Sequence, residues 1–410
     1  MANSFFTTDK ILQESLMLLE NELIMGNAVY TDYSDEFTTV GNTINIRRPV
    51  QYDGIDDNLD ITGVREDIQQ ATVPITMDKT FTIPVQIGAL ERTFDFDRFS
   101  KDILAPAMVK MKDRIETHIA SMYSDFYHFT GTPGTVPATF LSLGSMGAIL
   151  TDGAVPQSGR LGFHGTEASL ALADGLKGVF VQGKAKTAFE EAEIGRYAGF
   201  TNYETPYAPT HTVGALGGTP LVNGGTQSVT YAASKQTYSQ TLVTDGWTNS
   251  VTGVLLKGDV FTIAGVFAVN PVSHVSTGRL QTFVVKANVN SGASTGPATI
   301  TISPPMIISG AYQTVTAAPA DNAAITVRSG AAGVSYKQSL LLHPRSIALV
   351  TRKLDIPSGA GVKTTTKAGN KVVISCTEFV DGNTLAQTYR FDMLYKAVTV
   401  DARLGGRLTS

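Results

Sequence analysis

Cysteine, tryptophan and charged residues are scarce in this chain of 410 residues. The single cysteine, Cys376, excludes an intramolecular disulfide, and its place in the apolar run 372–376 predicts a buried side chain. Asp, Glu, Lys and Arg together make up only 17% of the residues, whereas about a quarter is usual in soluble domains. So little charge favours a subunit whose surface is largely buried against neighbouring subunits.

The chain also lacks runs of basic residues and long apolar runs. Its 32 Lys and Arg against 36 Asp and Glu give a net charge of −4, so tight non-specific binding to nucleic acid has no electrostatic basis. No stretch approaches the roughly 20 apolar residues that span a bilayer. The first residues lack the charged region and apolar core of a signal peptide. We expect cytoplasmic synthesis, no membrane contact and at most weak, non-specific contact with DNA.

Apolar residues make up an ordinary 42% of the chain, and its length predicts two or more hydrophobic cores. Amphipathic helices are predicted over 8–26 and 106–127. Leu16 and Leu19 lie on the apolar stripe of the first helix, which must dock on the chain's own body or on a neighbour. The second helix would run on the order of 30 Å, and its stripe also fits an ordinary core helix.

Residues 42–88 predict a long two-stranded β-ribbon. Apolar residues alternate with polar ones over 73–77 and 81–87, and the second run includes Phe81 and Ile83. The tip between the two arms is rich in turn residues and in aspartates, which are Asp53, Asp56, Asp57 and Asp60. A ribbon of this kind is only marginally stable alone. We therefore expect the ribbon and the first helix to make the inter-subunit contacts.

An all-β domain is predicted to interrupt a mixed one. At Gly214 the composition shifts to Thr, Val, Ser and Gly, which predicts a small β-barrel or sandwich inserted over 221–333. Its clearest strands are 254–269, 280–289 and 298–302, with no helix. Outside it, helices are predicted over 143–150 and 166–176, and strands over 195–206, 339–349, 371–376 and 389–400. The fold class is therefore α+β with an all-β insertion.

No pattern of catalytic or ligand-binding residues stands out. The glycine-rich segment 214–225 lacks the Gly-Lys-Ser/Thr ending of a phosphate-binding loop, so it predicts a linker. The six histidines occur singly, and the aspartates of 53–60 miss the spacing of a calcium loop. Asp95 and Asp97 precede a helix, where acidic caps are common, and no nucleophile motif occurs. We predict no enzymatic activity, no metal and no cofactor.

Several local sequences, taken in their order along the chain, resemble one family. They are 144–150, 199–206, 209–214, 257–266, 269–271, 276–281 and 390–395. Together with the order of the predicted elements, they resemble the major capsid proteins of tailed bacteriophages, which have the Hong Kong 97-type fold. The resemblance is closest to the podovirus coat proteins that carry an inserted domain, and it spans nearly the whole chain.

This resemblance implies a domain plan. The expected parts are an N-arm (1–41), an extended loop (42–88), a peripheral domain with a spine helix (89–140), an axial domain (141–220 and 334–376), an inserted β-barrel-like domain (221–333), and return strands with a C-terminal tail (377–410). It also implies assembly as hexamers and pentamers into an icosahedral head shell around double-stranded DNA. Scaffolding and portal proteins are the implied partners, and the virion capsid is the implied location. The lysine and asparagine that cross-link subunits in some relatives have no match here.

Two other classes of function remain to be weighed. A carbohydrate-binding surface or tail protein would use the insertion as its binding module, and it would need an exposed aromatic platform. The insertion holds one tryptophan, Trp247, and few tyrosines. A hydrolase with a β domain would need an acid–base or nucleophile constellation, which the sequence lacks.

Overall fold

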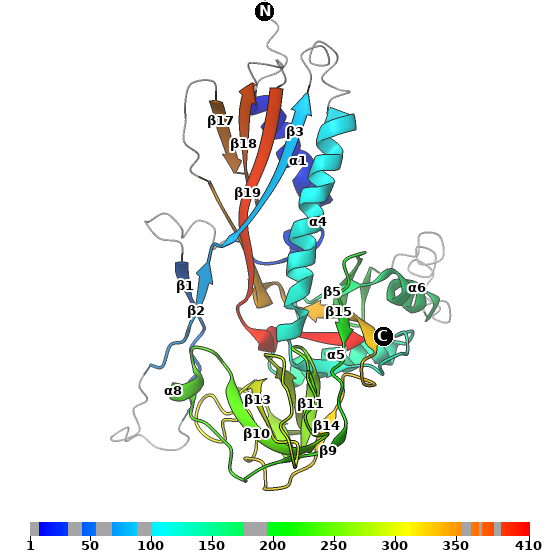
Figure 1. Ribbon diagram of the computed structural model, residues 1–410, viewed down its shortest axis with the longest axis vertical. Coiled ribbons are helices and arrows are strands. Elements are labelled where there is room, and N and C mark those ends of the chain that lie inside the picture. Colours follow the sequence, from blue (N-terminus) through cyan, green and yellow to red (C-terminus); the bar gives the residue numbers. More distant parts are fainter. Residues whose placement is uncertain are drawn as a thin grey trace, which may run out of the picture. The chain divides into compact units, whose positions relative to one another are not determined.

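A computed structural model describes residues 8–31, 43–54, 68–87, 100–175, 195–354, 362–368, 371–380 and 387–410. The chain divides into two compact units (Figure 1). The first unit comprises Met1–Asn45, Pro74–Ile119 and Ile347–Val398. The second unit comprises Ile46–Val73, Ala120–Ser346 and Thr399–Ser410. Each unit is therefore built from segments that are distant in sequence.

A five-stranded sheet forms the centre of the first unit. Its strands are β3 (Lys79–Ile87), β16 (Ile347–Arg352), β17 (Val362–Ala368), β18 (Val373–Val380) and β19 (Gln387–Thr399). The long strand β19 pairs antiparallel with both β3 and β18. Side chains that point to one face of β19, including Tyr389, Phe391 and Met393, are buried, as the period-two pattern of a half-buried strand requires. The strands predicted near 371–376 and 389–400 are confirmed.

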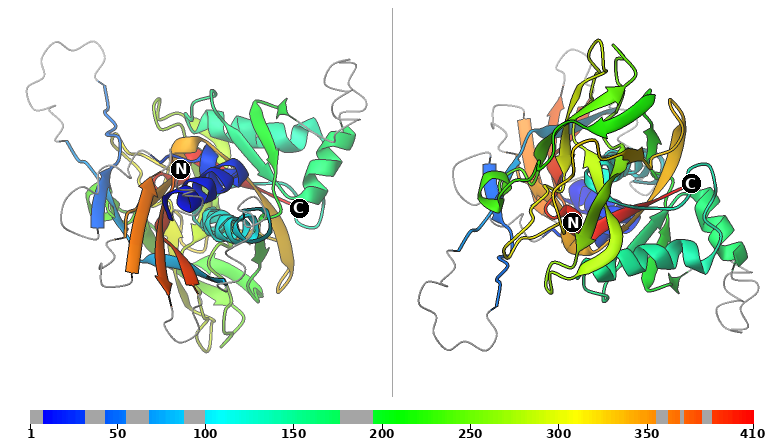
Figure 2. Two further views of the ribbon diagram at one scale, coloured as in Figure 1. Left: turned by 90° about the horizontal axis from the view of Figure 1, so that it is seen from above. Right: turned by 90° about the horizontal axis from the view of Figure 1, so that it is seen from below.

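Two helices of the first unit correspond to the predicted amphipathic helices. They are α1 (Thr8–Glu22) and α4 (Ala105–Ser121), and Figure 2 shows them side by side. The Nζ of Lys112 on α4 lies 2.9 Å from a carboxylate oxygen of Glu22 on α1. Both predictions were too long, because α1 ends at Glu22 before a short helix α2 (Met25–Ala28), and α4 gives way to a 3-10 turn (Met122–Asp125).

The break between α1 and α2 is filled by a buried carboxylate from α4. Glu116 accepts hydrogen bonds from the backbone N–H groups of Ile24, Met25 and Gly26 at 2.8, 3.0 and 3.2 Å. Backbone N–H groups at the start of a helix have no acceptor within the helix itself. The fully buried side chain of Glu116 supplies that acceptor here. Burial raises the pKa of Glu116, and the three N–H groups offset part of that rise. One side chain thus ties the N-terminal segment to α4.

A seven-stranded sheet forms one half of the second unit. Its strands are β4 (His128–Thr130), β5 (Leu161–His164), β6 (Arg196–Tyr197), β7 (Phe200–Glu204), β8 (Thr210–Thr212), β15 (Ser335–Leu342) and β20 (Gly405–Thr409). The helices α5 (Phe140–Asp152) and α6 (Thr166–Gly175) belong to the same unit, and they correspond to the helices predicted over 143–150 and 166–176. The turn before β7 is also as predicted, since β6 and β7 form a short hairpin.

The strand β20 corrects the expectation of a C-terminal tail. All five of its residues are buried, and it lies between β15 and β4 in the sheet. A Cβ at Gly405 would lie 2.6 Å from the Phe126 ring, and one at Gly406 would lie 2.5 Å from the sulfur of Met146. The two glycines therefore permit close packing within the sheet, where the sequence was interpreted as a C-terminal tail.

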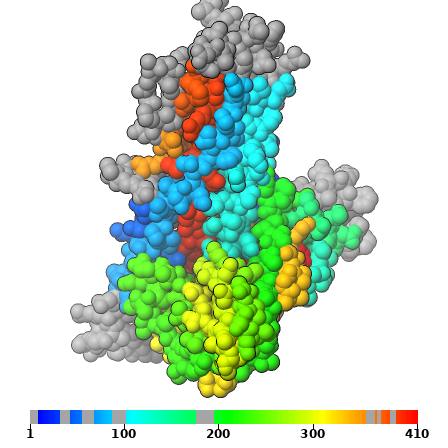
Figure 3. Space-filling view, viewed as in Figure 1, coloured from blue at the N-terminus to red at the C-terminus, as the bar shows by residue number. Residues whose placement is uncertain are grey.

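A six-stranded sheet forms the other half of the second unit. In spatial order its strands are β14 (Ile325–Val327), β11 (Val260–Val269), β12 (Ser276–Val285), β13 (Ala298–Ser303), β10 (Gln240–Trp247) and β9 (Gly218–Val222). We call residues 215–333 the inserted domain, coloured green to yellow in Figure 3. Trp247, Phe261 and Phe283 lie in its hydrophobic core. The all-β prediction is right except for one four-residue helix, α8 (Tyr231–Ser234).

Two predicted segments are divided differently in the structure. Among the described residues of 42–88, β1 (Thr43–Arg47) and β2 (Thr72–Thr76) form a two-stranded sheet, whereas β3 pairs with β19. The range 334–376 is also split, with β15 in the second unit and β16 and β18 in the first. In both cases the alternation of apolar residues indicated the strands, but it carried no information on their partners.

We expect Glu116→Ala to destabilise the first unit by about 2–4 kcal/mol, because three backbone N–H groups lose their acceptor. Glu22→Ala is the matched control, since its ion pair with Lys112 is half exposed and should contribute about 1 kcal/mol or less. Hydrogen exchange of the backbone amides of residues 24–26 measures the loss locally. Equal losses in the two variants would contradict the role given to Glu116.

The titration of Glu116 gives a second readout. Because burial raises its folded-state pKa, its protonated form favours folding and its ionised form opposes it. Relative to the non-titrating Glu116→Gln variant, the native protein should therefore lose stability as the pH rises from the ordinary range of a glutamate through the raised pKa. Urea unfolding of both proteins across that pH range measures the difference, and a constant difference would contradict the expectation.

Candidate functional site

The four predicted apolar contact residues lie within the first unit. Leu19 is fully buried and Leu16 nearly so, because α1 packs on the strands of its own unit. An inter-subunit contact of these two residues remains a prediction. Phe81 and Ile83 are half-buried on β3, opposite Met393 and Phe391 of β19. Phe81 also carries the guanidinium of Arg114 at 5.4 Å from its ring centroid.

The predicted acidic tip is described only at its beginning. Asp56, Asp57 and Asp60 lie outside the described residues. Asp53 is half exposed, and one of its carboxylate oxygens lies 3.7 Å from Nδ1 of His274 in the inserted domain. Its neighbour Tyr52 is 65% exposed. The beginning of the tip is therefore in contact with the inserted domain, and an inter-subunit role for these aspartates remains a prediction.

Tyr312 of the inserted domain contacts both segments that lead to the tip. We call residues 48–54 and 68–71 the root segments. The hydroxyl of Tyr312 accepts a hydrogen bond from the backbone N–H of Gln51 at 3.2 Å and donates one to the carbonyl oxygen of Gln69 at 3.1 Å. A single side chain therefore bridges the two root segments and fixes their separation.

Aromatic side chains of the inserted domain reinforce this bridge. Tyr231 stacks on Tyr312 with their ring centroids 3.5 Å apart. Ala71 is buried in a small cluster with Tyr231 and Ile307. The guanidinium of Arg48 lies 5.3 Å from the ring centroid of Tyr238, a distance at which the cation is attracted to the ring. We call this set of contacts the root clamp.

A two-stranded neck joins the inserted domain to the seven-stranded sheet. The strand β8 leads into the domain and β15 leads out, and the two pair antiparallel. Backbone hydrogen bonds extend the pairing from Val213 to Val334 at 3.0 Å and from Gly333 to Gly214 at 3.1 Å. The neck brings the two ends of the inserted domain together. The domain is therefore connected to the host sheet at the neck and through side-chain contacts.

The main side-chain contact at the neck is a buried His–Asp pair. Nε2 of His211 on β8 lies 2.9 Å from Oδ1 of Asp259 in the inserted domain, and both side chains are almost fully buried. The other oxygen of Asp259 accepts from the backbone N–H groups of Gly214 and Leu256 at 3.0 and 2.7 Å. The hydroxyl of Tyr123 lies 3.1 Å from Nδ1 of His211. Every polar atom of this pair therefore has a partner, as a buried charge requires.

A buried arginine from β20 completes the junction. Arg407 is fully buried and donates to the carbonyl oxygens of Phe126 and Gly258. Its guanidinium lies over the rings of Tyr123 and Phe129, at 5.5 and 5.8 Å from their centroids. Burial lowers the pKa of Arg407 to about 10, so it remains charged at neutral pH. It links the final strand of the chain to the inserted domain.

The residues that the structure describes give little support for a metal site, a reactive cysteine, a sugar-binding platform or a membrane-spanning helix. No three His, Cys, Asp or Glu side chains there are grouped to hold a metal ion. Cys376 is buried, as predicted, and burial raises the pKa of its thiol to about 12, which makes it unreactive. Trp247 is buried and donates to Thr244, so it offers no platform for a sugar. No helix of the described residues is long and apolar enough to cross a membrane.

A model of the family described as P22 coat protein (gene protein 5) matches residues 1–410. The chain belongs to this family. It is therefore a coat protein with a shell-forming role and a component of the phage capsid. Its mixed helix and sheet architecture is that of the Hong Kong 97-type fold. The resemblance of the sequence to podovirus coat proteins is confirmed.

Solved structures from phages are similar to this chain. One described as Mycobacterium phage Che8 shares 11% identity over 94% of this chain and 90% of its own, with a TM-score of 0.45. A chain of the mature capsid of bacteriophage PhiM1 shares 11% identity over 99% and 89%, with a TM-score of 0.41. The CUS-3 coat protein I-domain shares 25% identity over 28% and 99%, with a TM-score of 0.20. A search of proteins with curated functions gave no match.

Sequence reasoning missed the residues of the neck and of the root clamp. His211 and Asp259 both fall in segments that carry the family resemblance, 209–214 and 257–266, but they are separated by 48 positions and nothing in the spacing pairs them. Arg407 stands in a segment that was interpreted as a tail. Tyr312 lies in a turn-rich stretch with no periodic pattern around it. No local signal identified these contacts, because each depends on the tertiary fold.

We expect Asp259→Ala to destabilise the inserted domain by about 3–5 kcal/mol, because it removes one partner of a buried pair and leaves two N–H groups unsatisfied. Trp247 is the only tryptophan of the chain and lies in this domain, so its fluorescence during urea unfolding reports the change. Asp321→Ala is the control, since Asp321 accepts one backbone hydrogen bond at an exposed site and should contribute about 1 kcal/mol. Similar midpoints for the two variants would count against the junction.

Proposed function

We propose that many copies of this coat protein assemble as hexamers and pentamers into the icosahedral head shell of a tailed phage, which encloses double-stranded DNA. The observation that carries the proposal is the root clamp, in which Tyr312 holds both root segments. A loop that reaches a neighbouring subunit must leave its own subunit in a defined direction. The clamp supplies that direction through contacts at the base of the loop and leaves the residues of its tip free.

Exposed apolar residues next to the clamp support an inter-subunit role. Tyr52 is 65% exposed and Ile68 is 69% exposed, and they stand at the ends of the two root segments. Single exposed apolar residues are common, but these two flank the same loop. We infer that they and Asp53 lie against a neighbouring subunit in the shell, where closed symmetry repeats one heterologous contact many times.

Partners other than the coat protein itself follow from the family. We propose that a scaffolding protein directs assembly and that a portal protein occupies one vertex, after synthesis of the subunits in the host cytoplasm. Contact with the packaged DNA would be weak and non-specific, because the net charge of −4 includes no basic run.

The function is tested by deleting the loop tip, residues 53–60. We expect the variant to fold, with its Trp247 fluorescence unchanged, because the core of the inserted domain lies elsewhere. Assembly with a candidate scaffolding protein should fall strongly, since the tip is where the neighbouring subunit would be contacted. Negative-stain electron microscopy counts closed shells of uniform diameter. Normal shells from the deletion variant would refute the role of the tip.

A milder variant tests the clamp itself. Tyr312→Phe keeps the stacking on Tyr231 and removes only the hydroxyl that bridges Gln51 and Gln69, so we expect a stability loss of about 1 kcal/mol and a several-fold slower assembly. Tyr336→Phe is the matched control, because its hydroxyl accepts one backbone hydrogen bond, from Ala331, away from the root segments. Light scattering follows assembly of both variants. The clamp would be rejected if they assembled at the same rate.

A further inference from the structure

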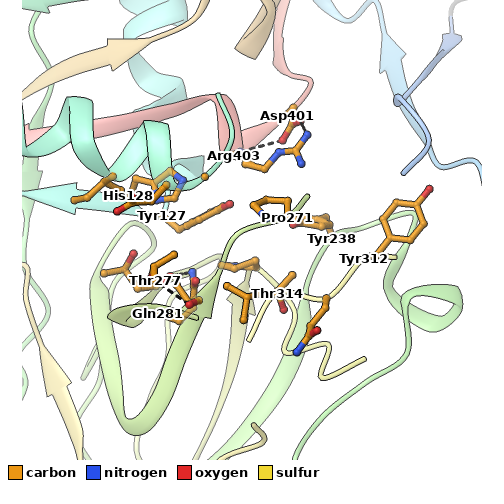
Figure 4. Close-up of a pocket in the computed structure, with 18 of the residues that line it drawn as sticks. Tyr127, His128, Tyr238, Pro271, Thr277, Gln281, Tyr312, Thr314, Asp401 and Arg403 are labelled. Carbon is orange, nitrogen blue, oxygen red and sulfur yellow. Dashed lines mark hydrogen bonds and ion pairs between the residues drawn. The ribbon is translucent and has the colours of Figure 1, made fainter. Parts of the chain in front are cut away.

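The second unit contains a cavity of about 130 Å³ next to the root clamp (Figure 4). Inserted-domain residues that line it include Pro271, Thr277, Gln281 and Thr314, and Tyr127, His128 and Arg403 line it from the host part of the unit. All the residues that line the cavity belong to the second unit. An engineered cavity of comparable size, about 150 Å³, binds benzene. The space therefore suits a molecule with a single ring.

The walls of the cavity are aromatic. Tyr127, Tyr231, Tyr238 and Tyr312 all line it. Burial raises the pKa of Tyr127 and of Tyr238, so both phenols stay neutral. Flat, neutral aromatic walls favour an aromatic guest, because offset and edge-to-face contacts between rings add to the gain from burying apolar surface. The tyrosines in its lining therefore make the cavity better suited to an aromatic guest than to water alone.

One wall presents a buried polar atom without a partner. Nε2 of His128 is inaccessible to solvent and makes no hydrogen bond with the described residues. Burial lowers the pKa of His128 to about 4, so the imidazole is neutral at pH 7. The imidazole therefore adds a neutral surface to this wall, and its unpaired nitrogen, which is closed off from solvent, makes no contact with a guest.

The charge of the lining favours an anion. Arg403 pairs with Asp401 at 3.2 Å, and Arg279 lies 3.5 Å from Asp152. Arg48 also lines the cavity, but no carboxylate of the described residues lies within ion-pair distance of it. Within the described part of the chain, the hydrogen bond of its side chain goes to the carbonyl oxygen of Val400. One guanidinium therefore remains available for a carboxylate, the anion that its planar geometry fits.

We propose that this cavity binds a small molecule that carries one aromatic ring and one carboxylate. The ring lies among the tyrosines, and the carboxylate pairs with Arg48. Because Arg48, Gln51, Tyr231 and Tyr312 belong both to the cavity lining and to the root clamp, a bound guest steadies the root segments. Binding itself does not depend on shell formation, whereas the effect on assembly rests on the proposed function.

The test measures binding of benzoate to the unassembled full-length protein by isothermal calorimetry, with neutral benzamide as the matched probe. We expect benzoate to bind with a Kd of about 1 mM or lower and benzamide to bind about tenfold more weakly. Benzoate should also raise the temperature at which Trp247 fluorescence reports unfolding. Saturable binding of neither probe, or equal affinity for both, overturns the proposal.

Two variants locate the site. Gly153→Leu fills the cavity, because a Cβ at Gly153 points toward Nε2 of His128 at 3.7 Å and meets no closer atom than 3.5 Å, and it should abolish binding. Arg48→Met keeps the length of the side chain and should remove the preference for benzoate over benzamide. Ala317→Leu adds the same side chain at an exposed position of the inserted domain and should bind normally. Undiminished benzoate binding by Gly153→Leu overturns the assignment to this cavity.

A separate assembly assay distinguishes this proposal from the proposed function. If the protein forms normal shells but binds no benzoate, the cavity assignment is overturned and the proposed function is not. A protein that binds benzoate selectively but forms no shells with any scaffolding protein would overturn the proposed function and leave the binding site intact. Faster assembly in the presence of benzoate, absent in Gly153→Leu, is the expected result for the native protein.

Discussion

The buried carboxylate of Asp259 determines how the inserted domain can be attached to its host. An ionised side chain with no access to water costs several kcal/mol unless its oxygens are paired. Here His211 of the host strand and the N–H groups of Gly214 and Leu256 satisfy both oxygens. The same pairing cannot form if the neck is rotated or shifted by one residue. The pair therefore contributes more to a unique orientation of the domain than to stability.

That orientation matters because the root clamp depends on it. Tyr312 and Tyr238 can contact the root segments only if the inserted domain is held in one pose at the neck. Arg407 adds a second constraint, since it joins β20 to the carbonyl oxygen of Gly258, next to Asp259 in the chain. A coat protein must present its contact loops in the same geometry in every copy. Two buried, directional contacts give the subunit that uniformity.

Local pattern was sufficient to predict the elements of this fold, and insufficient to predict their partners. The stripe of α1 and the alternation of β3 gave nearly correct elements, because each depends on residues a few positions apart. The alternation could not show that Phe81 faces Met393, more than three hundred residues later. Gly405 and Gly406 were interpreted as part of a C-terminal tail, because a glycine required for close packing looks the same in sequence as one in a loop.

The same limit applies to residues that join distant segments of the chain. Apolar residues on α1 suggested an inter-subunit surface, yet Leu19 is buried within its own unit, since an amphipathic stripe docks on the nearest available core. The inserted domain supplies the contacts of the root clamp, where Tyr312 combines a stacked ring with a hydroxyl that reaches two backbone segments. Such a residue has no periodic signature, because its function lies in joining segments that the sequence keeps apart. An insertion that stabilises the origin of a loop leaves the loop itself free to carry residues suited to a neighbour.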